Sequence, residues 1–221
     1  PVFMIKRNME STLREACNFF PVVTLTGPRQ SCKTTLVKTV FKNKPYCNFE
    51  NLDEREFAEK DPRAFLKKFS EGAILDEIQR VPSLLSYLQA YVDEKNKMGM
   101  FILTGSQNFS LIESLSQSLA GRTALLKLLP LSIPELTQHY KKVSDPETWI
   151  YQGFYPAVYS RKISPPLNYR SYIETYLERD LRLLIHLKEL SSFQTFLRLC
   201  AGRVGQLLNA QSLAGEVGVS S

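Results

Sequence analysis

The chain is poor in the residues that build metal sites and disulfide frameworks. Its 221 residues include 4 cysteines and 2 histidines. No two cysteines form a C-x-x-C pair, and neither His139 nor His186 lies near a cysteine in the sequence, which argues against a zinc site. Scattered single cysteines are typical of a reducing compartment, where most of them are small buried apolar side chains. We therefore expect a cytoplasmic protein.

The sequence also contains no apolar run long enough to span a bilayer and no signal peptide. Hydrophobic residues make up 43% of the chain and charged residues 23%, an ordinary globular balance that argues against a disordered chain. The length allows one sizeable α/β domain and a small appendage. A net charge of +6 permits contact with nucleic acid or nucleotide phosphates but specifies neither. The expected protein is globular and has no membrane partner.

The most informative stretch runs from Pro21 to Val40. Apolar and β-branched residues predict a strand that reaches Gly27, and a helical pattern opens at Lys33 and Thr34 after a turn-rich loop. A strand, a loop and a helix that begins with Lys and Thr are the context of a phosphate-binding loop. Lys33 would reach the terminal phosphates, and the Thr34 hydroxyl would ligate Mg²⁺. The predicted nucleotide-binding residues are Gly27, Pro28, Arg29, Gln30, Ser31, Cys32, Lys33, Thr34 and Thr35.

One position of this loop departs from the motif G-x-x-x-x-G-K-[ST], because Cys32 stands where the second glycine is expected. If the position needs a positive φ, cysteine costs about 1–2 kcal/mol locally; if φ is negative, the cost is mostly steric. A thiol at a helix N-terminus beside Lys33 is expected to have a lowered pKa and to oxidise readily. The sequence predicts weakened nucleotide binding and impaired hydrolysis, with the fold retained.

Two carboxylates, Asp76 and Glu77, end a short apolar strand downstream of the loop. Acids at strand ends often cap the next helix, and for this pair taken alone that interpretation is favoured. Together with Lys33 and Thr34, however, the pair indicates a Walker B sequence. Asp76 would then hold Mg²⁺, and Glu77 would orient and deprotonate the water that attacks the γ-phosphate.

Further polar residues flank the later predicted strands. Thr104 ends one predicted strand, and Ser106 and Gln107 follow it. These residues are candidates to polarise the lytic water, with helix capping as an equal alternative; Ser106 is the catalytic candidate. Arg122 precedes the fifth strand and would act near the strand tops as an arginine finger, in cis or in a neighbouring subunit of a homo-oligomer. The alternative of a salt-bridged surface arginine is more favoured. Arg29 would touch phosphate or pack the loop.

The alternation of apolar and amphipathic segments predicts the α/β class, with a mostly parallel sheet covered by helices on both faces. Strands are expected at 22–27, 46–50, 72–77, 100–104 and 124–129. In such sheets, ligands bind beyond the carboxyl ends of the strands. Gly27, Asp76 and Ser106 all lie at those ends, so the pattern predicts that they share one site.

The C-terminal part of the chain has a different pattern. Residues 164–166 are expected to form a linker, and residues 169–187 a long helix. Residues 211–220 are similar to the first helix and turn of a helix-turn-helix. The predicted organisation is a P-loop ATP-binding domain over 1–160 and a small all-helical region over 161–221.

Aromatic side chains gather shortly before the expected linker. This cluster favours a core or a domain interface over a surface for stacking nucleic-acid bases. Its members are Trp149, Tyr151, Phe154, Tyr155 and Tyr159.

Six stretches carry a resemblance that covers nearly the whole chain in order. They are GPRQSCKTTL (27–36), AILDEIQRVPSLL (73–85), FILTGSQNF (101–109), SLAGRTALLKLLPLSIPEL (118–136), YIETYLERDLRLL (172–184) and FLRLCAGRVGQLLN (196–209). They resemble a prokaryotic family of AAA-type ATPases in which the ATP-binding domain is followed by DUF4143. The resemblance implies an AAA+-like P-loop NTPase core, ATP and Mg²⁺ as cofactors, and a winged-helix-type region after the linker. It also implies that Arg122 lies in an arginine-bearing motif.

Members of that family continue into a region that resembles a restriction endonuclease, whereas this chain starts at Pro1 and ends where a recognition helix would begin. A truncated gene product is therefore one alternative, and the DNA binding that the family implies is in doubt for this chain. Two functions are expected. The first is a Mg²⁺-dependent ATPase with hydrolysis coupled to conformational change, favoured by the intact lysine and carboxylates. The second is a degenerate nucleotide-binding or DNA-associated regulatory protein without turnover, favoured by Cys32 and the early end.

Overall fold

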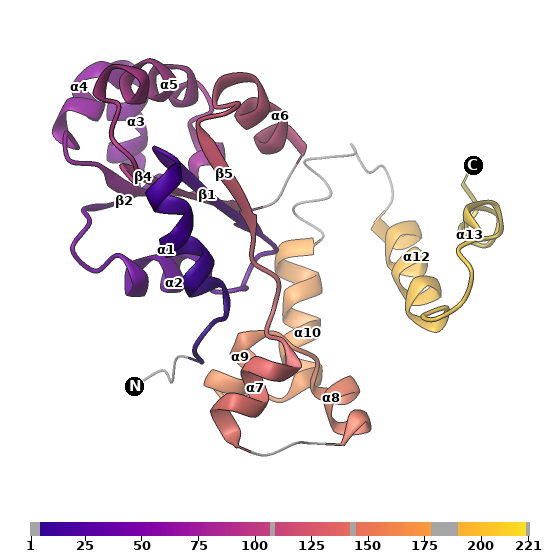
Figure 1. Ribbon diagram of the computed structural model, residues 1–221. Coiled ribbons are helices and arrows are strands. Elements are labelled where there is room, and N and C mark those ends of the chain that lie inside the picture. Colours follow the sequence, from indigo (N-terminus) through magenta and orange to yellow (C-terminus); the bar gives the residue numbers. More distant parts are fainter. Residues whose placement is uncertain (1–4, 107–108, 142–144, 178–189, 220–221) are drawn as a thin grey trace. The chain divides into compact units, whose positions relative to one another are not determined.

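Figure 1 shows the chain as a computed structural model, which describes residues 5–106, 109–141, 145–177 and 190–219. The chain divides into two compact units, Pro1–Pro165 and Pro166–Ser221. The first unit contains the β-sheet with the helices that cover it. The described part of the second unit consists of helices and their connections.

Among the described residues, five strands form one sheet in the order β2-β3-β4-β1-β5. Each neighbouring pair is parallel, which confirms the predicted α/β class and the parallel sheet. Every residue of β1, which lies between β4 and β5, is buried, as expected for a parallel strand covered on both faces. The strands are β1 (Val22–Gly27), β2 (Tyr46–Asn48), β3 (Ala73–Asp76), β4 (Phe101–Ser106) and β5 (Thr123–Lys127).

Helices cover both faces of this sheet (Figure 1). Ala73 and Leu75 of β3 belong to one apolar cluster and Ile74 to another, because successive side chains of a strand point to opposite faces. The first cluster includes side chains from α3 to α6, and the second includes side chains from α1 and α2. The helices are α1 (Met9–Phe19), α2 (Lys33–Val40), α3 (Leu52–Lys60), α4 (Pro62–Lys68), the 3-10 turn η1 (Ile78–Arg80), α5 (Leu84–Lys95) and α6 (Phe109–Ser118).

Four further helices complete the first unit or lead out of it: α7 (Ile133–Tyr140), α8 (Pro146–Gln152), α9 (Pro156–Ser160) and α10 (Pro165–Tyr172). The linker predicted over 164–166 is wrong in part, since α10 begins at Pro165. Proline lacks an amide hydrogen and has a helical φ, so it fits the first helical turn.

The second unit continues from α10 into a π-helical turn, η2 (Ile173–Leu177). Residues 169–177 of the long helix predicted over 169–187 are therefore helical, in α10 and η2, and its residues 178–187 lie outside the described ranges. The helices α12 (Leu190–Gly202) and α13 (Ala210–Val217) follow. No helix in the described ranges combines the length and the apolar composition that crossing a bilayer requires.

A buried ion pair fastens the segment before α1 to the start of α7. Arg7 Nε donates to Glu135 Oε1 at 3.0 Å, and both side chains are almost fully buried. The remaining Arg7 nitrogens donate to the carbonyl oxygens of Ser31, Leu129 and Pro130. These partners lie on separate parts of the chain, so one guanidinium joins the N-terminal segment, the loop after β1 and the segment after β5.

The first prediction concerns Gly27, whose φ is +152° and whose Cβ, if present, would lie 2.1 Å from the carbonyl oxygen of Leu128. A backbone atom cannot swing aside, so we expect Gly27→Ala to lower the free energy of unfolding by about 3 kcal/mol. In the control Gly121→Ala, φ is +75° and the new Cβ meets no described atom within 4 Å, so the loss should be about 1 kcal/mol. Urea unfolding measures both, and equal losses would contradict the prediction.

The second prediction concerns Glu135. Desolvation raises its pKa, but hydrogen bonds from the Ser132 and Asn8 amides and the charge of Arg7 outweigh that effect and hold the pKa below its usual range. A carboxyl with a depressed folded-state pKa adds stability above its unfolded pKa of about 4.3 and loses it as the pH falls through the folded value.

We therefore expect Glu135→Gln to lower the free energy of unfolding by about 2 kcal/mol at neutral pH, because Arg7 loses a charged partner. The difference from the wild type should shrink below about pH 4. Urea unfolding between pH 7 and pH 3 measures it, with the exposed Glu15→Gln as control. A difference that stays constant over this range would show that the charge of Glu135 is irrelevant.

Candidate functional site

The carboxyl edge of the sheet brings several predicted site residues together. Gly27 pairs with Ser106 where β1 and β4 end, and Asp76 is the last residue of β3. Because β3, β4 and β1 are parallel neighbours, their ends lie at one edge, where α2 begins after the loop (Figure 1). This edge is where parallel α/β sheets bind their ligands.

The loop between β1 and α2 has left-handed backbone at two residues with side chains. The φ angles of Gln30 and Cys32 are +61° and +66°. Of the two alternatives for Cys32, the structure has the positive φ, for which a side chain costs about 1–2 kcal/mol. Within the loop, Ser31 is buried and its hydroxyl donates to the Pro28 carbonyl at 2.9 Å. The loop is therefore held in a strained but internally bonded conformation.

The pKa of the Cys32 thiol differs from the prediction. The residue is exposed, yet the surrounding loop desolvates the thiol, which raises its pKa above the ordinary value. The charges of Arg7, Arg161 and Lys33 lower the pKa but offset only part of this effect. The predicted lowered pKa is wrong because desolvation outweighs the nearby positive charges. At neutral pH the thiol is protonated.

Lys33 is the first residue of α2, and only 7% of it is exposed. Its Nζ donates to the carbonyl oxygens of Gly27 and Pro28, at 3.0 and 2.9 Å. Burial lowers the pKa of Lys33, whereas the nearby charges of Glu77 and Asp76 raise it. The amine thus lies against the start of the loop, within electrostatic reach of both predicted Walker B carboxylates.

Asp76 accepts hydrogen bonds from three hydroxyl groups while only 4% exposed. Thr34 Oγ1 lies 3.1 and 2.9 Å from the two carboxylate oxygens, and the Tyr46 hydroxyl donates to Oδ2 at 2.8 Å. Thr104 Oγ1 donates to Oδ1. Burial, followed by the bond to Asp76, raises the pKa of Tyr46 far above its usual range, so this hydroxyl remains a donor at any physiological pH.

Thr34 and Asp76 fit a magnesium ion by the chemistry of their donor atoms. Magnesium prefers oxygen ligands, and it usually takes one or two carboxylates together with waters and phosphate oxygens. These two residues are 42 positions apart in the sequence, yet they are directly hydrogen-bonded. They are therefore the pair in this edge that could hold the ion.

Glu77 begins a second cluster, which includes one residue that the sequence did not indicate. Its backbone is left-handed, with a φ of +59°. Gln79 Nε2 donates to Glu77 Oε2 and also to Ser106 Oγ, the latter at 3.1 Å. Burial raises the pKa of Glu77, which the Gln79 bond opposes, and the charge of Asp76 raises it further. Only the pairing of strands β3 and β4 brings these residues together, so the spacing of the motif could not reveal Gln79.

The three candidates at the carboxyl end of β4 are now distinguished by their partners. Thr104 is bound to Asp76, whereas Ser106 is bound to Gln79 and through it to Glu77. Gln107 lies outside the described residues. Ser106 therefore belongs to the cluster of Glu77, and Thr104 to the cluster of Asp76.

Arg122 lies at the opposite edge of the sheet. It immediately precedes β5, and its carbonyl oxygen accepts from the Val22 amide at the start of β1. Its guanidinium forms two bonds with Asp93, at 2.6 and 2.8 Å. The expectation that Arg122 lies near the strand tops is wrong, because a residue before a parallel strand lies at the amino edge. Its surroundings are those of the salt-bridged alternative, and an arginine-finger role would require a second copy of the chain.

The remaining loop residues lie around this centre. Arg29 is half-buried, and its charge lowers the pKa of both Lys33 and Glu77, so it lies close to the two. Thr35 is exposed, and its carbonyl oxygen accepts from Thr39 within α2. Arg29 is therefore placed to meet an anion at the edge, whereas Thr35 faces solvent.

Arg7 contributes to the loop from outside the motif. Its Nη1 donates to the carbonyl oxygen of Ser31 at 3.0 Å. In a trans peptide the C=O and N–H groups point in opposite directions, so this bond turns the Cys32 amide hydrogen away from Arg7. The contact spans 24 residues, and no periodicity or motif in the sequence indicates it.

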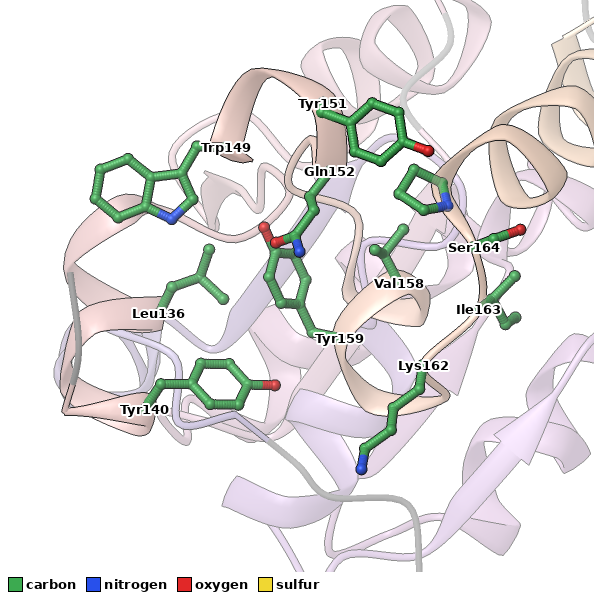
Figure 2. Close-up of a pocket in the computed structure, with 11 residues that line it drawn as sticks. Leu136, Tyr140, Trp149, Tyr151, Gln152, Val158, Tyr159, Lys162, Ile163 and Ser164 are labelled. Atoms are coloured by element: carbon green, nitrogen blue, oxygen red, sulfur yellow. The ribbon is translucent and has the colours of Figure 1, made fainter. Parts of the chain in front are cut away.

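The aromatic cluster lies in α8, α9 and the turn between them. Phe154 and Tyr159 pack against a small core cluster, and Tyr159 donates to the Gly153 carbonyl at 2.6 Å. Trp149, Tyr151 and Tyr159 line a pocket of about 560 Å³, shown in Figure 2. These contacts match the predicted core for Phe154 and Tyr159, whereas Tyr151 is 64% exposed.

The fold has solved counterparts. The Walker-type ATPase PABY2304 of Pyrococcus abyssi matches with a TM-score of 0.56 and 15% identity, over 97% of this chain and 89% of that chain. The ORC2 protein of Aeropyrum pernix in its ADP form matches with a TM-score of 0.50 and 16% identity, over 98% and 80% of the two chains. At these identities the likeness concerns the fold, which is that of P-loop ATPases.

Two curated relatives are longer than this chain. The uncharacterized proteins Mb2031c of Mycobacterium bovis and Rv2008c of Mycobacterium tuberculosis are each 34% identical to it over 219 residues. The aligned region is 97% of this chain but 48% of each relative. The chain therefore spans about half the length of these proteins.

Family comparisons divide the chain into two parts. Residues 143–221 match a domain of unknown function, DUF8612, and not the DUF4143 that the resemblance had implied. Residues 20–137 match a family described as AAA domain. This second match covers more than half of the chain and includes every element of the sheet and the loop before α2. The chain belongs to the AAA domain family.

Proposed function

We propose that this chain binds ATP with Mg²⁺ at the carboxyl edge of its sheet and hydrolyses it to ADP and inorganic phosphate. The observation that carries the proposal is the contact of the Thr34 hydroxyl with both carboxylate oxygens of Asp76, at 3.1 and 2.9 Å. It joins the start of α2 to the end of β3 beside the buried amine of Lys33. Membership of the AAA domain family supports the proposal.

Phosphate binding would fall to the loop and to the first turn of α2. Backbone N–H groups at a helix N-terminus attract anions, and the Cys32 amide hydrogen is directed away from Arg7 by the bond to Ser31. Lys33 Nζ would exchange its bonds to the loop carbonyls for phosphate oxygens. Its half-exposed neighbour Arg29 adds a second positive charge at the same edge.

The metal would be held by Thr34 and Asp76. When bound there, the ion would supply positive charge to offset the negative charge that develops on the phosphate during transfer. Tyr46 and Thr104 donate to the Asp76 carboxylate from β2 and β4. They would keep its orientation when the Thr34 hydroxyl turns its lone pair to the ion.

Glu77 would act as the general base. Its carboxylate accepts a proton from water as the water oxygen bonds to the γ-phosphorus. The bond from that phosphorus to the bridging oxygen breaks, and ADP leaves with the electron pair. Glu77 then releases its proton to solvent. A partly desolvated carboxylate with a raised pKa is a stronger proton acceptor than an ordinary one.

The third prediction separates this ATPase from a degenerate protein without turnover. Glu77→Gln should lower the rate of phosphate release about 100-fold or more, because the proton acceptor is lost, while the affinity for ATP·Mg²⁺ stays within about threefold. Lys33→Ala should abolish detectable binding. The exposed, distant Glu71→Gln serves as the matched control and should behave as the wild type. Turnover that survives Glu77→Gln would rule out the proposed base.

The fourth prediction concerns the left-handed backbone at Cys32. Cys32→Gly should raise the free energy of unfolding by about 1 kcal/mol, because glycine adopts positive φ without strain. It should also tighten ATP binding several-fold, since a residue without Cβ lets the backbone approach the phosphates. Cys32→Ala keeps the Cβ and removes only the thiol, so neither gain should appear. Urea unfolding and titration with a fluorescent ATP analogue measure these effects, and equal results for the two variants would refute the prediction.

A further inference from the structure

The amide of Gln79 joins the ends of two strands. Gln79 lies in the turn η1, which Glu77 separates from β3, and its Nε2 donates to Glu77 Oε2 and to Ser106 Oγ. An amide nitrogen carries two hydrogens, so both are used. Because Glu77 directly follows β3 and Ser106 is the last residue of β4, one side chain fixes the distance between two polar groups of the proposed site.

The identity of the amide atoms follows from these partners. A carboxylate accepts hydrogen bonds and cannot donate them, so the atom facing Glu77 must be nitrogen. The oxygen Oε1 then lies buried, without a hydrogen-bond partner among the described residues. Leaving a buried acceptor unpaired is unfavourable, but turning the amide over would place its oxygen against the Glu77 carboxylate. The two bonds of the nitrogen therefore hold the amide in this orientation.

Gly105 makes room for this amide. A Cβ at position 105 would lie 2.5 Å from Gln79 Oε1 and 2.8 Å from Leu111 Cδ2. Both atoms are ends of flexible side chains, so a methyl group there would displace the Gln79 amide without moving the backbone of a strand. The sequence Thr-Gly-Ser at the end of β4 thus combines a partner for Gln79 with the space that Gln79 needs.

We propose that Gln79 is a positioning residue of the ATPase site, which fixes the Glu77 carboxylate relative to Ser106 and thereby directs it toward the attacking water. The proposal rests on the function proposed above and adds a residue to it. Gln79 acts through Glu77 and does not itself touch the nucleotide. A carboxylate on a flexible side chain samples several rotamers, and the bond to Gln79 selects one of them.

The fifth prediction tests the bridge in the nucleotide-free full chain by NMR. The side-chain NH₂ resonances of Gln79 are identified by their loss in Gln79→Met. Glu77→Ala, Ser106→Ala and Gly105→Ala should each shift these resonances upfield, because each removes or displaces a hydrogen-bonding partner. Gly121→Ala should leave them unchanged. If the chemical shifts of these resonances stay unchanged in all three variants, Gln79 does not bridge Glu77 and Ser106. This result does not depend on whether the protein hydrolyses ATP.

The catalytic use of the bridge is tested by phosphate release and ATP affinity, measured separately. Gln79→Met and Gly105→Ala should each lower kcat about tenfold or more, while the Kd for ATP·Mg²⁺ stays within about twofold. Gln117→Met is the matched control, because Gln117 also donates from its amide to a glutamate, but on the exposed surface of α6. It should leave both quantities unchanged.

A double substitution distinguishes positioning from general weakening of the fold. Because Gln79 acts only through Glu77, adding Gln79→Met to Glu77→Gln should cause no further loss of kcat. Losses that multiply, or wild-type kcat in Gln79→Met and Gly105→Ala, would overturn the role of Gln79 alone. If the wild type itself shows no turnover that depends on Glu77, the proposed hydrolysis fails and the catalytic role of the bridge fails with it.

Discussion

The Asp76 carboxylate is the constraint on which the carboxyl edge of the sheet depends. A buried carboxylate needs hydrogen-bond donors, and the chain supplies three hydroxyls from α2, β2 and β4. These bonds join the start of α2 to β3, and through Asp76 to β2 and β4, and so fix where the loop before α2 can lie. The same oxygens are the natural ligands of a divalent cation. One buried charge thus serves both the fold and the proposed site.

Backbone strain is present in the loop and the turn that contain the proposed site. Gln30, Cys32 and Glu77 have positive φ there, as do Asn96, Lys141 and Lys162 elsewhere among the described residues. Each such side chain costs free energy that the surrounding structure must supply. Part of that support comes from Arg7, which holds the Ser31 carbonyl while its own charge is paired with Glu135. The strained loop is therefore supported from the amino-terminal segment and from α7, outside the motif itself.

The sequence predicted the parts of the site that depend on local order along the chain. Lys33, Thr34 and Asp76 could be placed because a strand, a loop and a helix of fixed hand bring them to one edge. Arg7 and Glu135 are 128 residues apart, and nothing in their local sequence indicates a buried pair. The position predicted for Arg122 was wrong because it was inferred from the motif. The direction of β5 puts the residue at the amino edge of the sheet. The sign of φ at Cys32 could not be predicted, because the same local sequence is compatible with a positive or a negative φ.

Binding and turnover depend on different elements of the proposed site. The loop, Lys33 and the Arg7 support lie between β1 and α2, whereas Glu77, Gln79 and Ser106 lie at the ends of β3 and β4. Cys32 belongs to the first group and contacts none of the second in the described hydrogen bonds. In the proposed function, cysteine at a position where the motif has glycine would weaken phosphate binding, while the residues that would accept the proton stay in place. We therefore propose an ATPase that binds ATP weakly, in preference to a degenerate protein without turnover.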